Sequence, residues 1–413
     1  MRYFTERFKY LFKKNNLHCI LIALTFSLSS DFSIANEKDQ AYRIHIKLTG
    51  IPPSSDVLEQ MLTKISAGHI KEAAYIAMEN PNFYTVTLKN WATPWTNEQA
   101  NIYATLNDYS ATVIGMVRDD VDFREVLSAD ILYIGHANLG LPDYAIDNNA
   151  HYQALEAQDI NLKEQLVATE QSAKTGLPVE ATAGIFTTRA AAKSFFIDGT
   201  NRAMFRFTLI NHLCTDLEAL KDTSRAPDRI RQDVSRSPGG DSRLFMNSCS
   251  GCHSAMDPLT QAFAYYDFEY NSDTDPSGEN GRLVYNQENQ LDSQTNSRVK
   301  AKYHINSNNF KYGYITENDR WDNYWRNGIN ANLGWSSELS GSGLGAKSMG
   351  QELANSTAFA QCQVKKVFKN VCLRSPENSQ DHNQIDTMVS NFKSSQYQIK
   401  HVFADAADYC KGN

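Results

Sequence analysis

Apolar residues return every three or four positions through most of the chain, and this spacing predicts a mostly α protein. In one clear case Val57, Met61 and Ile65 follow Ser54, a residue type that caps helix starts well. The same spacing predicts helices over 70–78, 98–116, 123–129, 155–172, 189–196, 202–214, 241–248, 351–354, 359–371, 383–393 and 402–410. Two stretches differ: we expect residues 36–41 to be loose and 42–48 to be extended.

The pentapeptide Cys249-Ser250-Gly251-Cys252-His253 carries the most specific chemical signal in the chain. Two cysteines separated by two residues and followed at once by histidine are typical of covalent c-type haem attachment. The thiols of Cys249 and Cys252 would bond to the two vinyl groups of the porphyrin. The imidazole of His253 would bind the iron from one side. The pattern therefore predicts one covalently attached haem c.

Three other uses of this cysteine pair stay open, namely a redox dithiol, half of a zinc site and a structural bridge. A zinc ribbon needs a second closely spaced pair, whereas Cys362 and Cys372 lie too far apart. A thioredoxin-like dithiol would follow a strand, whereas 241–248 has a helical pattern. Haem is therefore favoured.

Proline and glycine residues predict where the helices end and where the domains meet. Residues 221–240 are polar and contain Pro227 and Gly239-Gly240, which is typical of a surface connection. We expect a helical N-terminal domain over 36–220 and, after this connection, a cytochrome-c-like haem domain with closing helices over 241–413. The helix of the motif should stop at Asp257, because Pro258 disfavours helical backbone in the residue before it.

The first 35 residues have the pattern of a secretory signal peptide. A basic stretch that includes Arg7 and Lys13 precedes an apolar run over 17–28, and Ser33-Ile34-Ala35 resembles a cleavage site. The run is short for a membrane span, although an uncleaved anchor is the alternative. We therefore expect export to the periplasm or cell envelope.

Export places the remaining cysteines in an oxidising compartment. Once haem has taken two, Cys214, Cys362, Cys372 and Cys410 are left, and an even number favours two disulfides. We favour Cys372–Cys410, which would tie the last helix down, together with Cys214–Cys362. Four free buried thiols are the alternative.

Composition and charge argue against several partners. The chain has 413 residues and a formal charge of −7 without a basic stripe, so nucleic acid is not expected. Three aspartates within 119–122 fit a capped turn better than a metal cluster. The acidic loop over 271–281 has Pro276 where a calcium loop needs glycine, and the Gly-rich run over 341–348 lacks the second glycine of a phosphate loop. Neither calcium nor phosphate binding is therefore expected.

The second axial position of the iron decides between electron transfer and chemistry at the metal. Met349 is our candidate, because it lies downstream in a Gly/Ser-rich loop just before a helix. Met256 is expected to be core packing, since three residues after His253 it shares the proximal side. His304 and an open position are the alternatives.

Several stretches around the motif are similar to those of a known group. They are Met256-Asp257-Pro258-Leu259, Ala183-Gly184-Ile185-Phe186, Asn211-His212-Leu213-Cys214, Leu48-Thr49-Gly50-Ile51-Pro52-Pro53, Asp122-Phe123-Arg124-Glu125-Val126-Leu127, Leu353-Ala354-Asn355-Ser356, Phe359-Ala360-Gln361-Cys362 and Phe392. In these stretches the chain resembles the planctomycete-type cytochrome-c-associated proteins, a largely uncharacterised family of exported proteins. The resemblance implies a mostly helical exported haem protein. It carries over Cys249, Cys252 and His253 and implies no reaction.

These observations favour one-electron transfer by an exported mono-haem c-type cytochrome with a redox partner protein. Two other functions stay open. One is a haem peroxidase or oxygenase with an open distal site, which the size of the chain favours. The other is a structural or partner-binding module of the envelope. The sequence identifies no small-molecule substrate.

Overall fold

The computed structural model describes residues 36–412 and is mostly helical, with 55% of residues in helices and 7% in strands. The mostly α class is therefore confirmed. The α-helices are α1 (Glu37–Thr49), α2 (Ser55–Ser66), α3 (Ile70–Met78), α4 (Lys89–Ala92), α5 (Asp108–Arg118), α6 (Ala150–Ala157), α7 (Leu162–Gln165), α8 (Gln171–Thr175), α9 (Arg189–Phe195), α10 (Arg202–Thr208), α11 (Ser242–Leu244), α12 (Ser250–Thr260), α13 (Gly345–Ala354), α14 (Thr357–Cys372), α15 (Ser379–Ser394) and α16 (Ile399–Tyr409).

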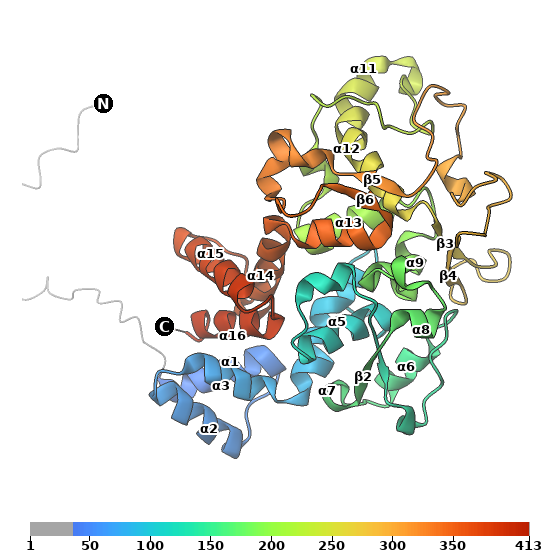
Figure 1. Ribbon diagram of the computed structural model, residues 1–413. Helices are drawn as coiled ribbons and strands as arrows, with labels where there is room; N and C mark the ends of the chain where they lie inside the picture. Colours follow the sequence, from blue (N-terminus) through green and yellow to red (C-terminus); the bar gives the residue numbers. More distant parts are fainter. Residues whose placement is uncertain (1–35, 413) are drawn as a thin grey trace, which may run out of the picture.

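Three small antiparallel pairs of strands join the helices (Figure 1). The strands are β1 (Leu132–Gly135) with β2 (Leu166–Thr169), β3 (Tyr266–Glu269) with β4 (Arg282–Tyr285), and β5 (Arg320–Asp322) with β6 (Ser342–Leu344). Each pair is short, so the sheets act as local braces between helices and do not form a layer of their own.

The first described helix corrects the prediction of a loose segment and a strand over 36–48. Asn36 caps α1 by accepting a hydrogen bond from Asp39 N, and Gly50 ends it with a φ of 78°. Ala41, Ile44 and Leu48 are fully buried, which is helical spacing. The alternation of polar and apolar residues over 42–48 resembled a strand, but the caps at both ends favour a helix.

Two other helix predictions were wrong in extent. The helix expected over 98–116 begins only at α5, where Asn107 forms a capping box with Ser110. The helix expected over 155–172 is divided into α6, α7, the strand β2 and the start of α8. In contrast, α2 with its N-cap Ser54, α3 and α9 follow the predicted bounds closely.

The C-terminal helices pack against the N-terminal helices, as the blue and red segments of Figure 1 show. The ring of Phe83, which follows α3, lies 5.0 Å from that of Phe403 in α16, edge to face. Lys47 at the end of α1 donates from Nζ to the carbonyl of Cys410 at 2.7 Å. Residues at the two ends of the chain thus form one packed helical unit.

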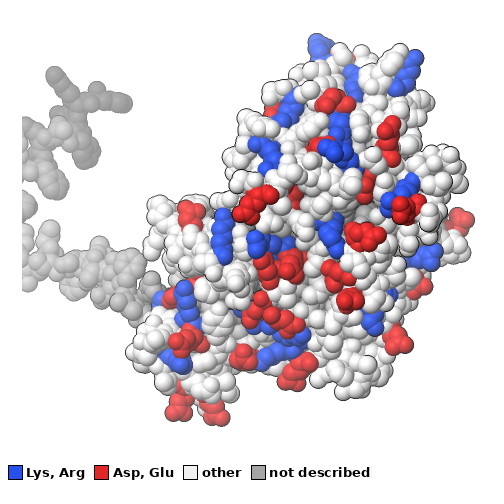
Figure 2. Space-filling model, viewed as in Figure 1, with Lys and Arg blue, Asp and Glu red and all other residues white. Residues whose placement is uncertain are grey.

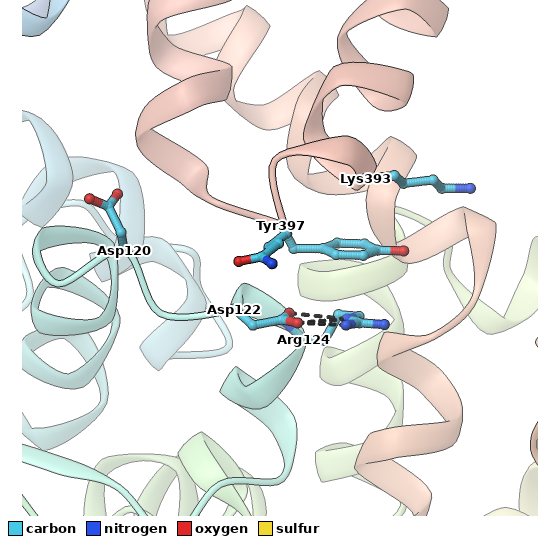
Figure 3. A pocket seen from close by; sticks show the side chains of 6 residues that line it. Asp120, Asp122, Arg124, Lys393 and Tyr397 are labelled. Carbon is cyan, nitrogen blue, oxygen red and sulfur yellow. Dashed lines mark hydrogen bonds and ion pairs between the residues drawn. The ribbon is translucent and has the colours of Figure 1, made fainter.

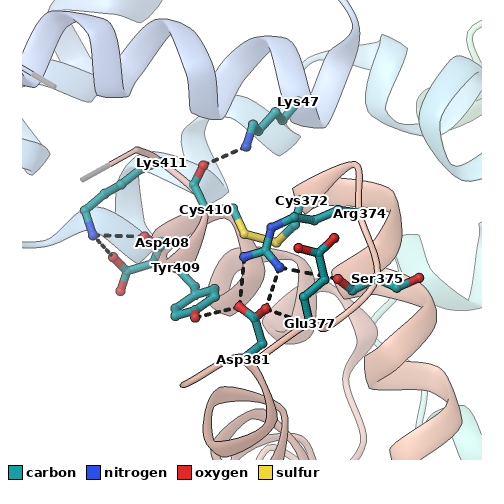
Figure 4. The surroundings of a disulfide bond; sticks show 10 residues. All are labelled: Lys47, Cys372, Arg374, Ser375, Glu377, Asp381, Asp408, Tyr409, Cys410 and Lys411. Carbon is teal, nitrogen blue, oxygen red and sulfur yellow. Dashed lines mark hydrogen bonds and ion pairs between the residues drawn. A yellow bond between two sulfur atoms is a disulfide. The ribbon is translucent and has the colours of Figure 1, made fainter. Parts of the chain in front are cut away.

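Both predicted disulfides are present. Cys214 pairs with Cys362 across a Cα–Cα distance of 5.2 Å, and Cys372 pairs with Cys410 across 5.4 Å. The second bond ties α16 to the end of α14, as expected (Figure 4). The alternative of four free thiols is therefore wrong.

The segment predicted as a domain boundary, 221–240, does not separate two cores. One continuous hydrophobic cluster includes Ala41, Phe205, Leu259 and Ala407, which lie on both sides of it. A small second cluster consists of Ala264, Tyr265, Val299 and Tyr303. The reason is that α14 and α16 bury their apolar faces against elements of the N-terminal half.

The predicted signal peptide, 1–35, lies outside the described residues. Within 36–412, every helix is too short or too polar to cross a membrane. On the face seen in Figure 2, acidic and basic side chains of the described residues are interspersed.

Candidate functional site

The motif Cys249-Ser250-Gly251-Cys252-His253 lies on a continuous helical run in the lobe that contains α11 and α12 (Figure 1). A short π-helix, Phe245–Cys249, leads into α12, and Ser250 N donates to the carbonyl of Phe245. Cys252 and His253 follow Cys249 by three and four residues, so each of them lies next to Cys249 on the helix surface. The motif therefore places both thiols within one helical turn of the imidazole.

The prediction that the motif helix ends at Asp257 was wrong, because α12 continues through Pro258 to Thr260. The carboxylate of Asp257 accepts hydrogen bonds from Arg202 and from the backbone N–H of Arg231. These contacts hold residue 257 in helical conformation against the preference that the following proline imposes.

The two motif thiols are free and partly buried, whereas Cys214, Cys362, Cys372 and Cys410 are all paired. Cys252 Sγ lies 3.6 Å from the carbonyl of Leu217. Burial, followed by the charge of Glu218, raises the pKa of the Cys252 thiol.

Gly251 lets the segment that carries Asp222 lie directly against the motif. Asp222 N donates to the carbonyl of Gly251 at 3.0 Å. A Cβ atom at position 251 would lie 2.6 Å from Cγ of Lys221 and 3.3 Å from Asp222 N. The small residue between the cysteines thus has a packing role, since it lets this segment approach the motif closely.

The imidazole of His253 is oriented by a carboxylate. Its side chain is 22% exposed, and Nδ1 lies 3.1 Å from Oδ1 of Asp257, one helical turn later. Nδ1–H donates to the carboxylate, so Nε2 is the nitrogen left with a lone pair, and it has no hydrogen-bond partner among the described residues. This is the arrangement in which metal-binding histidines are held in other proteins.

Asp257 is completely buried and ionised. Burial alone would raise its pKa, but Arg202 and His253 lower the pKa well below its usual range. Arg202 reaches Asp257 Oδ1 and Oδ2 at 2.8 and 2.9 Å, and it also contacts both oxygens of Asp233, at 2.5 and 3.0 Å. The pKa of Arg202 is raised by the two carboxylates in spite of its burial. A negative charge is thus held firmly behind the imidazole.

Apolar side chains are exposed next to the motif. Leu244 and Met246, in the turns before Cys249, are 49% and 50% exposed. Ile329 is 62% exposed and follows Gly328, which approaches Asp222 and Arg225 beside the motif. These side chains leave apolar surface that a bound porphyrin would remove from water. Together with the free thiols and the free Nε2, they fit a covalently bound porphyrin.

Met349 does not lie in a flexible loop, as predicted, but inside α13, where it is fully buried. The next residue, Gly350, packs so closely on Leu127 that a Cβ would lie 1.9 Å from its carbonyl oxygen. The Gly/Ser pattern that suggested a loop instead supplies this close helix contact. Iron binding by Met349 stays a prediction.

The other iron-ligand candidates also have structural partners. Met256 is 4% exposed and belongs to the core, as expected. His304 Nε2 lies 2.8 Å from the carbonyl of Thr316. The aromatic run after the motif packs inward, with Phe263 edge to face against Phe186 and Phe196.

The three aspartates of 119–122 each have a basic partner. Asp122 caps the 3₁₀ turn Phe123–Leu127 and pairs with Arg124 at 2.6 Å. Figure 3 shows this pair in a surface hollow, with Arg124 4.3 Å from the ring centre of Tyr397. Asp120 pairs with Lys400 at 2.8 Å. The capped turn that the sequence predicted is therefore confirmed.

No family model, curated protein or solved structure matches this chain. Within residues 36–412, no group of three His, Cys, Asp or Glu side chains is placed to hold a metal ion. The motif offers a single imidazole, and a haem iron would need no other ligand from it, because the porphyrin would supply the equatorial nitrogens and the imidazole an axial one.

Sequence reasoning missed Arg202 and Asp233, which complete the charged network behind His253. Arg202 precedes Asp257 by 55 residues, and nothing in the local pattern of either residue indicates the other. Asp257 itself could have been noticed, because it follows His253 by four residues and so lies on the same face of a helix.

Proposed function

We propose that this protein is an exported mono-haem c-type cytochrome that transfers one electron at a time. The observation that carries the proposal is one helical turn that holds two free thiols and a carboxylate-oriented imidazole. Bound haem would supply the electron chemistry by cycling between Fe(II) and Fe(III).

The roles of the residues follow from their atoms. Cys249 and Cys252 would anchor the porphyrin through thioether bonds, and both thiols are reachable because they are only partly buried. His253 would bind the iron through Nε2, since Nδ1 is directed at Asp257. Leu244, Met246 and Ile329 would be covered by the porphyrin, which removes apolar surface from water.

Export supports the proposal from another direction. The pattern over 1–35 is that of a signal peptide, and two disulfides are typical of oxidising compartments. Cytochromes of the c type need their motif cysteines reduced when haem is attached. The free thiols of Cys249 and Cys252, beside four paired cysteines, fit that division.

Met349 is proposed as the second axial ligand. Its thioether is fully buried in α13, so binding the iron would require this part of the core to repack around the haem. The test is the Met349→Leu variant, which keeps the volume and removes the sulfur. Loss of the weak far-red band of Met–iron bonding in the variant supports the assignment, and an unchanged ferric spectrum contradicts it.

The experiment that tests the whole proposal is expression of the full chain in a host that attaches c-type haem, followed by denaturing electrophoresis with haem staining. The wild type should retain haem, and the variant with both Cys249→Ala and Cys252→Ala should lose it entirely. Cys214→Ala with Cys362→Ala is the matched control, because it also removes two cysteines but should retain haem. Haem that stays bound without the motif cysteines would overturn the proposal.

Absorption spectra of the wild type then separate an electron carrier from an enzyme. A low-spin spectrum in both oxidation states supports the carrier. A high-spin ferric spectrum that shifts on addition of cyanide or peroxide contradicts it and favours an open distal site.

A further inference from the structure

The carboxylate of Asp257 connects the motif imidazole to a buried network of charges. Oδ1 lies 3.1 Å from His253 Nδ1 and accepts from Arg202 Nε at 2.8 Å. Oδ2 accepts from Arg202 Nη2 at 2.9 Å and from the backbone N–H of Arg231 at 3.1 Å. Each oxygen of the Asp257 carboxylate thus accepts two hydrogen bonds, so its capacity as an acceptor is filled.

The network balances two arginines against two aspartates. Arg202 pairs with Asp257 and Asp233, and the side chain of Arg231 donates to the Thr200 hydroxyl at 3.0 Å. Arg231 is 1% exposed, and its Nε and Nη1 have no hydrogen-bond partner among the described residues. Charges held at such depth interact more strongly than charges in water. A change in one of them should therefore be felt at the imidazole.

We propose that Asp257 is the positioning residue of His253, and that Arg202 controls how much of the Asp257 charge reaches the imidazole. The carboxylate fixes the ring with Nε2 directed away from the network and makes that nitrogen a more electron-rich ligand. The inference rests on the proposed function, because it assigns this role toward a haem iron that His253 binds.

The sign of the effect follows from the charge. An electron-rich axial ligand stabilises Fe(III) more than Fe(II), so it lowers the reduction potential. Asp257→Asn keeps an oxygen that can accept from Nδ1–H but removes the negative charge. The variant should therefore favour Fe(II) over Fe(III) by about tenfold at a fixed solution potential, a shift of about 59 mV for one electron.

A redox titration of the purified full chain tests this. Wild type and Asp257→Asn are compared by optical titration, with covalent haem measured separately by haem staining. Asp381→Asn is the matched control, because Asp381 is also a fully buried carboxylate paired with an arginine, Arg374, but in the C-terminal helices. We expect an upward shift of the potential in Asp257→Asn and none in the control.

A potential that is unchanged or lower in Asp257→Asn, or an equal rise in the control, overturns the inference. If Asp257→Asn does not accumulate as folded protein, Arg202→Lys replaces it. Lysine keeps the positive charge but loses the fork that binds Asp257 through two nitrogens, so the potential should fall, and an unchanged potential again overturns the inference. Absence of covalent haem from the wild type would instead defeat the proposed function, and the inference with it.

Discussion

Two carboxylates of this protein are fully buried and bound by an arginine, namely Asp257 in α12 and Asp381 in α15. Asp381 accepts from Arg374 at 2.5 and 2.8 Å and from the Tyr409 hydroxyl at 2.8 Å, beside the Cys372–Cys410 disulfide (Figure 4). Its partners lie in the loop between α14 and α15, from which Arg374 comes, and at the end of α16, which contributes Tyr409.

Asp257 differs in one partner. In addition to Arg202 and the backbone of Arg231, it contacts the partly exposed imidazole of His253. The ion pair of Asp381 thus contacts only structural partners, whereas the ion pair of Asp257 also contacts a partly exposed side chain of the candidate site. Burial and pairing with an arginine are common to both carboxylates, so by themselves they do not indicate a functional role. The contact with His253 is what distinguishes Asp257.

The largest expected effect comes from removing the disulfide next to Asp381. Cys372→Ala with Cys410→Ala opens a loop whose ends are 38 residues apart in sequence, which should lower the free energy of unfolding by about 4 kcal/mol through the entropy of the unfolded chain. Denaturant unfolding of the purified protein measures this loss. Covalent haem content should not change, and its loss would show that the two regions are not independent.

Asp381→Asn should have the next largest effect on stability. The amide cannot replace the charged contacts with Arg374, so we expect a loss of about 2 kcal/mol in the free energy of unfolding at neutral pH. Denaturant unfolding again provides the measurement. A loss close to zero would mean that Asp381 and Arg374 contribute little despite their geometry.

Gly251→Ala tests the close packing on the motif side of the comparison. The added methyl would meet Lys221 and the backbone of Asp222, so a loss of about 1 kcal/mol is expected as this segment moves away. Thermal unfolding measures the loss, and Gly239→Ala is unsuitable as a control because its φ is 62°. Ser248→Ala, at an exposed position one residue before the motif, is the better control and should leave stability unchanged.

The smallest effect is a dependence on pH. The contacts with Arg374, opposed by burial, lower the pKa of Asp381 in the folded state. A lowered pKa contributes stability above the unfolded value of about 3.9, and this contribution is lost as the pH falls through the folded value. The difference in stability between wild type and Asp381→Asn should therefore shrink below about pH 4. A difference that stays constant down to acid pH would contradict this assignment.

The sequence by itself determined the local features of this protein. The N-caps Ser54 and Asp122, the helical spacing of Val57, Met61 and Ile65, and the motif from Cys249 to His253 depend on neighbours within a few residues. Hydrogen bonds and side-chain contacts over one helical turn are set by composition and spacing, which is why these predictions could be made.

Only the tertiary structure decided the rest. It placed Met349 in a buried helix, joined the two predicted domains through one core, and brought Arg202 onto Asp257 across 55 residues of sequence. It also determined that α1 is a helix where alternation had suggested a strand. Contacts between distant segments depend on how apolar faces pack in three dimensions, and one-dimensional patterns carry little information about that packing.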